Sequence, residues 1–320
     1  MLFSKIIEKQ FAKVLGRYDG DPALYYGTPE EYPGLVAEPF DVTMSEGTVL
    51  RGFFYYYGAF DPERLIVFDH GIGAGHRAYM REIAYLAEHN YTVYSYDHTG
   101  CVMSDGTGIH GFAQGVADLD RVLTVLQADS RFANVPRKIM GHSWGGYSCM
   151  NVAALHPEVT HVVSLAGFVS ARLLCEQYVP NPFLKYVDEV MDRERQHNPQ
   201  YADMDARKSL KKAPARALHI QSKDDSMVKF NLCYELLAQN LGEEDGVEFI
   251  EVDGLDHNPQ RTKAAVEALG VMQKDLAQKH KKHALDTKEQ QDAFRAAYDW
   301  KLITEQDSAM WEKIFAFLEK

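Results

Sequence analysis

The sequence predicts an α/β protein with a mostly parallel, eight-stranded sheet flanked by helices, and three observations lead to this fold class. Short apolar runs typical of buried strands alternate with longer segments whose apolar residues recur at helical spacing. Hydrophobic residues make up 46% of the 320 residues, which is enough to build a core. A serine between glycines lies where an apolar strand passes into a helix. We expect one domain over residues 1–320, because α/β cores with insertions often reach this length.

The first expected element is a hairpin of residues 40–44 and 49–57, with its turn at Ser45-Glu46-Gly47. This hairpin precedes the first crossover, so we expect it to form the antiparallel edge of the sheet. The remaining strands are expected at residues 65–68, 92–96, 137–140, 162–165, 217–221 and 247–252. Helices are expected at residues 77–89, 112–126, 144–155 and 308–318.

Two segments interrupt this alternation of strands and helices. Residues 168–212 form a helical excursion that contains several tyrosines and precedes the strand at 217–221. Residues 258–301 form a second excursion, which is charged, rich in alanine and also predicted to be helical. For the first segment, an ordinary surface excursion is the alternative to a role in shaping a binding pocket.

The serine between glycines lies in Gly141-His142-Ser143-Trp144-Gly145. In such a G-x-S-x-G turn, small residues on both sides let the backbone bend sharply and leave the serine hydroxyl exposed. Ser143 is therefore a candidate nucleophile. Its hydroxyl needs a histidine to accept its proton and an acidic group to orient that histidine. The backbone N–H of Trp144 is expected to donate to the oxyanion that forms on attack.

Candidate partners follow two later strands. The strand at 217–221 leads into a loop with Asp224 and Asp225, and the strand at 247–252 leads into a loop that ends at His257. With the serine turn, these loops resemble the α/β-hydrolase family, whose acid lies in a G-x-x-D-x-x-V loop and whose histidine lies in G-x-x-H. The resemblance covers about residues 38–257 and the last helix. It implies that Asp225, three residues before Val228, is the acid and that His257 is the base.

The same resemblance implies three further features. The family's H-G-x turn matches His70-Gly71-Ile72, so the N–H of Ile72 is expected to be the second donor of the oxyanion hole. Residues 168–212 fall where the family inserts a helical cap over the active site. The chemistry of a serine, histidine and aspartate needs no metal and no organic cofactor.

Each assignment has a rival in the sequence. Asp224 adjoins Asp225, and two aspartates in a polar loop are by default merely solvated. Ser222 stands where the family usually has glycine, which can change the turn of the acid loop. His280 and His283 compete with His257, but they lie among lysines on a segment that is typical of an exposed helix face.

A dinucleotide-binding unit is the alternative for the glycine loop after the strand at 65–68. Counted from Gly73 and Gly75, the third position of the fingerprint is Ala78, a permitted variant, and Asp97 follows at the end of the next strand. However, residues 97–104 also resemble the hydrolase segment D-x-R-G-x-G-x-S. The hydrolase is favoured, because a dehydrogenase would leave the serine, the acid and the histidine as three coincidences.

The function expected from these residues is a serine hydrolase that cleaves a small-molecule carboxylic ester. The tyrosines of residues 168–212 favour an apolar acyl or aryl group, and esters have good leaving groups. An amidase or peptidase with the same three residues is the alternative enzyme. A non-catalytic binding module on the hydrolase fold is the alternative from another class, although such a protein would usually have lost one of the three.

Composition limits the binding partners and the cellular compartment that we expect for this protein. A net charge of −12 disfavours nucleic acid, because binding phosphates requires clustered Lys and Arg. The scattered cysteines are expected to be reduced thiols, and no signal-peptide or membrane-spanning pattern is found, so a cytoplasmic enzyme is expected. An amphipathic helix over residues 2–15 is compatible with contact to an anionic membrane, but such helices more often pack on their own protein. A homodimer is left open.

Overall fold

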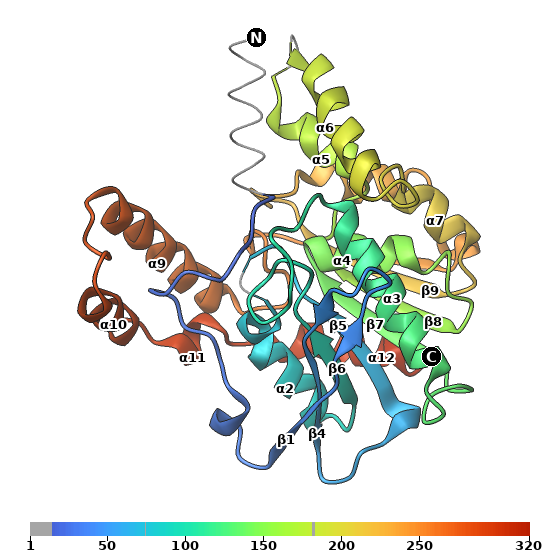
Figure 1. Ribbon diagram of the computed structural model, residues 1–320, viewed down its shortest axis with the longest axis horizontal. Coiled ribbons are helices and arrows are strands. Elements are labelled where there is room, and N and C mark those ends of the chain that lie inside the picture. The colour runs from blue at the N-terminus through green and yellow to red at the C-terminus, as the bar shows by residue number, and fades with distance from the viewer. Residues whose placement is uncertain (1–14, 74, 181–182) are drawn as a thin grey trace.

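The computed structural model describes residues 15–73, 75–180 and 183–320 (Figure 1). The amphipathic helix expected over residues 2–15 falls, except for Leu15, outside these described residues. Within them, an eight-stranded sheet forms the centre of the molecule and carries helices on both faces. The α/β class and the mostly parallel sheet are therefore confirmed. In the described ranges, no helix combines the length and the apolar character that crossing a membrane needs.

The strands of this sheet lie in the order β1-β4-β6-β5-β7-β8-β9-β10. Their bounds are β1 Leu35–Pro39, β4 Gly52–Tyr57, β5 Leu65–Asp69, β6 Thr92–Tyr96, β7 Arg137–His142, β8 Val159–Leu165, β9 Arg216–Ser222 and β10 Val247–Val252. β4 pairs antiparallel with both β1 and β6, whereas all other neighbours are parallel. The loops that follow β5, β7, β9 and β10 therefore leave the sheet at the same edge.

The expected hairpin of residues 40–44 and 49–57 is wrong as the edge of the sheet. The edge strand is β1, while β2 (Val42–Thr43) and β3 (Val49–Leu50) form a separate two-stranded sheet. The turn at residues 45–47 does exist, because the N–H of Met44 donates to the carbonyl of Thr48 at 2.8 Å. The strand β1 ends at Pro39, which has no N–H to donate and is tolerated on an edge strand.

Helices cover the two faces of the sheet because side chains of each strand alternate between them. The bounds of these helices are α2 Met80–Glu88, α3 Ala113–Ala128, α4 Trp144–Val152, α8 Tyr234–Ala238 and α12 Ser308–Leu318. Val67 and Ile139 belong to one core with residues of α3 and α4. Their sequence neighbours Ile66 and Met140 belong to a second core with residues of α2 and α12. The sheet thus separates two buried cores, and the site residues lie at its edge.

Residues 168–212 carry three helices, α5 (Ala171–Tyr178), α6 (Lys185–His197) and α7 (Ala206–Lys212). Figure 1 shows α5 and α6 extending beyond the sheet, with α7 beside α4. Besides its buried apolar residues, a buried carboxylate joins α6 to the body of the molecule. The carboxylate of Glu194 accepts hydrogen bonds from the N–H groups of Phe112, at 2.7 Å, and Ala113, at 3.0 Å, where α3 begins. A carboxylate at a helix N-terminus offsets the unpaired N–H groups found there.

Glu194 makes stability depend on pH in a direction that can be tested. Burial raises the pKa of Glu194 to about 7, although the two backbone N–H groups oppose this. The folded protein therefore holds this proton more tightly than the unfolded chain, and the associated stability is lost as the pH rises toward about 7. We expect the thermal unfolding midpoint of the wild type, relative to Glu194→Gln, to fall between about pH 5 and pH 8. A difference that does not change with pH would contradict this.

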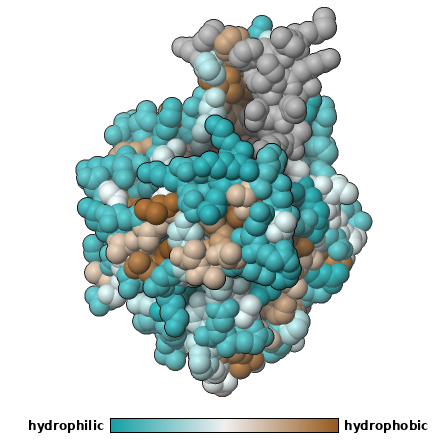
Figure 2. Space-filling view, turned by 90° about the vertical axis from the view of Figure 1, so that its left-hand side faces the viewer, coloured by the Kyte–Doolittle hydropathy of each residue, from teal (hydrophilic) through white to brown (hydrophobic). Residues whose placement is uncertain are grey.

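Residues 258–301 contain α9 (Lys263–Lys281) and α10 (Lys288–Ala296), and α11 (Trp300–Ile303) begins within them; these helices project from the sheet on the left of Figure 1. Together with Ala23 of the N-terminal segment they enclose a small separate core, which includes Met272 and Phe294. Figure 2 views this side of the molecule and shows a largely hydrophilic surface with apolar residues gathered near its middle. A buried ion pair, in which Arg261 Nη2 lies 3.2 Å from Glu82 Oε1, anchors the segment to α2.

Candidate active site

Ser143 lies on the sharp turn that the sequence predicts between β7 and α4. Its backbone has φ 55° and ψ −111°, a conformation that few residues other than glycine adopt. The flanking glycines allow this turn. A Cβ on Gly141 would lie 2.3 Å from the carbonyl carbon of Gly145, and a Cβ on Gly145 would lie 2.1 Å from the carbonyl oxygen of Asp69. Larger residues would therefore push the turn apart.

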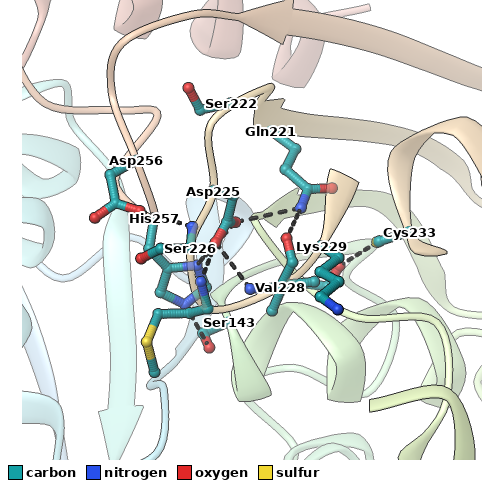
Figure 3. A network of polar contacts seen from close by, with 12 residues as sticks. Ser143, Gln221, Ser222, Asp225, Ser226, Val228, Lys229, Cys233, Asp256 and His257 are labelled. Carbon is teal, nitrogen blue, oxygen red and sulfur yellow. Dashed lines mark hydrogen bonds and ion pairs between the residues drawn. The ribbon is translucent and has the colours of Figure 1, made fainter. Parts of the chain in front are cut away.

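His257 lies between Ser143 and Asp225 (Figure 3). Its Nε2 is 2.8 Å from Ser143 Oγ, and its Nδ1 is 2.9 Å from Asp225 Oδ2. A carboxylate can only accept, so Nδ1 carries the proton and Nε2 is left to accept from the serine hydroxyl. The Asp225 carboxylate is fully buried, whereas 13% of the His257 side chain is exposed. The three residues lie on three separate loops at one edge of the sheet.

Both aspartates of the acid loop are engaged, but with different partners. Asp225 Oδ1 accepts the N–H groups of Met227, at 2.9 Å, and Val228, at 2.8 Å. Asp224 Oδ1 accepts the N–H of Gly254 at 3.0 Å and that of Asp256 at 3.3 Å. The expectation that a rival aspartate would be merely solvated is therefore wrong for Asp224, because it ties the acid loop to the loop that carries the histidine.

Ser222, which stands where the resembled family usually has glycine, contributes to the same connection. Its hydroxyl donates to Asp224 Oδ1 and accepts the N–H of Leu255 at 3.2 Å. The other two histidines pair elsewhere, since His280 Nε2 lies 2.6 Å from Asp21 Oδ2 and His283 Nδ1 lies 3.2 Å from Asp286 Oδ2.

The glycine loop after β5 is held by His70. The Nδ1–H of His70 donates to the carbonyl of Gly71 at 2.7 Å, and its Nε2 accepts the N–H of His98 at 3.0 Å. Burial lowers the pKa of His70 to about 3, so the ring is neutral and can fill both roles. Because the carbonyl and the N–H of one trans peptide point in opposite directions, the N–H of Ile72 points away from the ring of His70. Trp144 is the first residue of α4, where helix N–H groups have no partner within the helix.

Two polar residues that sequence reasoning missed connect the glycine loop after β5, the serine turn and the loop that carries His257. The N–H of Gly71 donates to Tyr79 Oη at 3.2 Å, and Tyr79 Oη donates to His142 Nδ1 at 2.8 Å. His142 Nε2 in turn donates to the carbonyl of His257 at 2.7 Å. Burial lowers the pKa of His142 well below its usual range, which keeps the ring neutral. Spacing in the sequence carries no signal for these contacts, because they join residues far apart in the chain.

The dinucleotide-binding alternative does not fit the surroundings of Asp97. Both oxygens of this buried carboxylate already accept hydrogen bonds, from the backbone N–H of His76 at 2.8 Å and from that of Met103 at 3.0 Å. The His76 ring lies against it as well, with Nδ1 at 2.7 Å. A carboxylate enclosed in this way is not presented to a ribose hydroxyl.

The sheet order and the serine turn define an α/β hydrolase. The family model described as serine aminopeptidase S33 matches residues 61–241, and the chain belongs to this family. Ser143 and Asp225 lie within the matched residues, and His257 follows them. No curated protein sequence matches the chain at a significant level.

Solved structures with the same fold include enzymes of more than one kind. An esterase from Pyrococcus furiosus superposes with a TM-score of 0.58 at 14% identity, covering 89% of this chain and 99% of its own. An acetyl xylan esterase from Paenibacillus sp. R4 gives 0.56 at 14% identity, covering 78% and 94%. A puromycin-hydrolysing peptidase from Mycobacterium tuberculosis gives 0.52 at 15% identity, covering 69% of this chain and 36% of its own. At these identities the likeness shows the fold alone.

Proposed function

We propose that the protein is a serine hydrolase that cleaves carboxylic esters through an acyl-enzyme intermediate. Ser143 is the nucleophile, His257 the general base and Asp225 the acid that orients it. The observation that carries the proposal is the unbroken hydrogen-bond chain from Ser143 Oγ through His257 to Asp225, with contacts of 2.8 and 2.9 Å. A serine becomes nucleophilic at neutral pH when a neutral imidazole can take its proton in this way.

The reaction proceeds in two balanced halves. Ser143 Oγ attacks the acyl carbonyl while its proton passes to His257 Nε2, and the backbone N–H groups of Trp144 and Ile72 stabilise the oxyanion. When the intermediate collapses, His257 returns the proton to the departing alcohol. Water then attacks the acyl-enzyme by the same route, which releases the carboxylic acid and restores the serine. This chemistry uses side chains and backbone groups only.

Apolar groups around the acid loop support an ester with an apolar acyl or aryl part. Met227, which follows the acid by two residues, is 53% exposed, and Ile72 of the glycine loop is 39% exposed. The hydroxyl of Tyr178 on α5 donates to the carbonyl of Met227, which ties residues 168–212 to this loop. We propose that these residues form a cap that shapes the substrate pocket.

A peptidase is the second candidate, and the description of the matched family favours it. An aminopeptidase must hold the cationic amino terminus of its substrate, for which a carboxylate is the usual partner. The buried carboxylate of α6, Glu194, is already bound by two backbone N–H groups, so it does not serve as that partner.

The test that discriminates the ester hydrolase from the peptidase is a panel of p-nitrophenyl esters of graded chain length beside aminoacyl p-nitroanilides. Preference for the esters supports the proposal, preference for the anilides supports the peptidase, and no turnover would favour a binding module.

Substitution of the two neighbouring aspartates tests the acid. Asp225→Asn is expected to lower kcat by about 10⁴-fold, because an amide that donates to His257 selects the wrong tautomer. Asp224→Asn is expected to lower kcat less than about tenfold, because its amide oxygen can still accept the N–H groups of Gly254 and Asp256. Both values are measured on the best ester of the panel. A large loss confined to Asp224→Asn would transfer the role to that residue.

A further inference from the structure

A buried polar chain continues behind the acid, on the side away from His257 (Figure 3). Gln221, the sixth residue of β9, is fully buried, and its Nε2 lies 3.2 Å from Asp225 Oδ2. The same nitrogen donates to the carbonyl of Val228 at 2.7 Å. Both partners can only accept, so the two hydrogens of the amide nitrogen are both used and its orientation is determined.

The chain of hydrogen bonds extends from Gln221 into the sheet. Gln221 Oε1 lies 3.3 Å from His219 Nε2, and His219 Nδ1 lies 3.1 Å from the hydroxyl of Ser164 on β8. Because Oε1 can only accept, His219 Nε2 carries the proton and Nδ1 accepts from Ser164. His219 and Gln221 are two residues apart on one strand and so share one face of the sheet. Every link therefore points toward the acid, from Ser164 through His219 and Gln221 to Asp225.

We propose that Gln221 is a positioning residue for the acid. Its amide holds the plane of the Asp225 carboxylate and weakens the hydrogen bond that this carboxylate accepts from His257. This inference rests on the proposed function. The two backbone N–H groups bind Asp225 Oδ1, whereas Gln221 is the donor other than His257 seen at Oδ2 among the described residues. A carboxylate oxygen that accepts a second hydrogen bond stabilises the imidazolium less. Being neutral, the amide does this without adding charge.

Four titratable groups face Asp225 and His257 from the elements packed around them. Burial lowers the pKa of His142 well below its usual range and that of His219 to about 4. Burial also raises the pKa of the Cys233 thiol well above its usual range and raises that of Tyr178. These four groups come from the end of β7, from β9, from the residue before α8 and from α5, and all are neutral at neutral pH.

The remaining charged neighbours lie in the adjoining loops. Burial raises the pKa of Asp224, but the hydroxyl of Ser222 and the backbone N–H groups that donate to this carboxylate lower its pKa more, so it stays ionised near neutral pH. Asp256 accepts the N–H of Ser226 at 2.8 Å. The guanidinium of Arg261 interacts with His142, and its Nη2 pairs with Glu82. None of these groups is altered by a substitution at position 221.

The test is Gln221→Met, which keeps the length and the net charge of the side chain but removes both donors. We expect kcat/KM for the best ester to fall roughly tenfold to a hundredfold, with the loss in kcat, because the buried side chain does not reach substrate. We also expect the acidic limb of the kcat/KM profile to move up by about half to one pH unit, since Asp225 then stabilises the imidazolium more. The position of this limb does not depend on how much of the variant is folded. Gln221→Leu removes the same donors and is expected to move the limb in the same direction.

Gln177→Met is the matched control. Gln177, on α5, holds the same loop from outside, with its Nε2 on the carbonyl of Met227 and its Oε1 accepting the N–H of Lys229, but it has no contact with the acid. If Gln221 only supported the loop, the two substitutions would act alike. A limb that stays at its wild-type pH in Gln221→Met, or moves equally in Gln177→Met, overturns the inference.

A double variant separates this inference from the proposed function. In an Asp225→Asn background, Gln221→Met is expected to change the rate of labelling by a fluorophosphonate less than about twofold, because the two residues act through one contact. Additive losses would overturn the positioning role while leaving the triad intact. Full activity of Ser143→Ala or Asp225→Asn would instead overturn the proposed function itself.

Discussion

Ser143→Ala is expected to lower kcat by on the order of 10⁴ to 10⁶ and to abolish labelling by a fluorophosphonate, because only an activated serine attacks phosphorus at a useful rate. The fold should survive. The N–H of Ser143 donates to the carbonyl of Leu165 at 2.8 Å, and its carbonyl accepts the N–H of Tyr147 at 3.0 Å. Both hydrogen bonds use backbone atoms, which alanine also has. Residual activity is expected, since the oxyanion donors remain. Turnover of the best ester and mass spectrometry of the labelled peptide measure the two effects.

Ser148→Ala is a suitable control for this substitution. Ser148 lies on α4, the helix that follows Ser143, and is buried, and its hydroxyl donates to the carbonyl of Trp144 at 3.0 Å instead of to an imidazole. This variant should still be labelled at position 143. Labelling that persists in Ser143→Ala would show that another residue is the nucleophile.

His257→Ala is expected to lower kcat about as much as loss of the serine, because the members of a triad act as a unit. Without the imidazole, the serine hydroxyl at 2.8 Å loses its proton acceptor, and the buried carboxylate of Asp225 loses its partner. We therefore expect a lower unfolding midpoint as well as lost turnover, since a buried charge without its partner is destabilising. Steady-state kinetics and thermal unfolding measured on one preparation would separate the two losses.

The matched control for the base is His283→Ala. The side chain of His283 is 82% exposed and pairs with Asp286 at the surface, where an ion pair contributes little. Its loss should leave turnover and stability nearly unchanged. Wild-type turnover in His257→Ala would show that the base assigned here is wrong.

Some features of the fold could be predicted because they are local. The last helix occupies Ser308–Leu318, the bounds expected from its apolar spacing, and its N-cap Asp307 accepts the N–H groups of the first turn. The serine turn can be predicted for the same reason, because strand, glycines and helix are consecutive in the sequence. The edge strand of the sheet cannot be predicted in this way. Strand pairing between β1 and β4 depends on residues far from the turn at 45–47, so the turn signal led to the wrong edge strand.

For the site, the amino-acid sequence alone indicates which residue types can perform the chemistry and the order in which Ser143, Asp225 and His257 follow their strands. Which aspartate faces the histidine is seen only in the folded chain, since register along a loop does not reveal the direction of a side chain. It also revealed Tyr79, His142 and Gln221 as partners of the site. Their contacts are hydrogen bonds between buried groups from different strands and loops, and such contacts come into existence only when parallel strands bring their ends to one edge of the sheet.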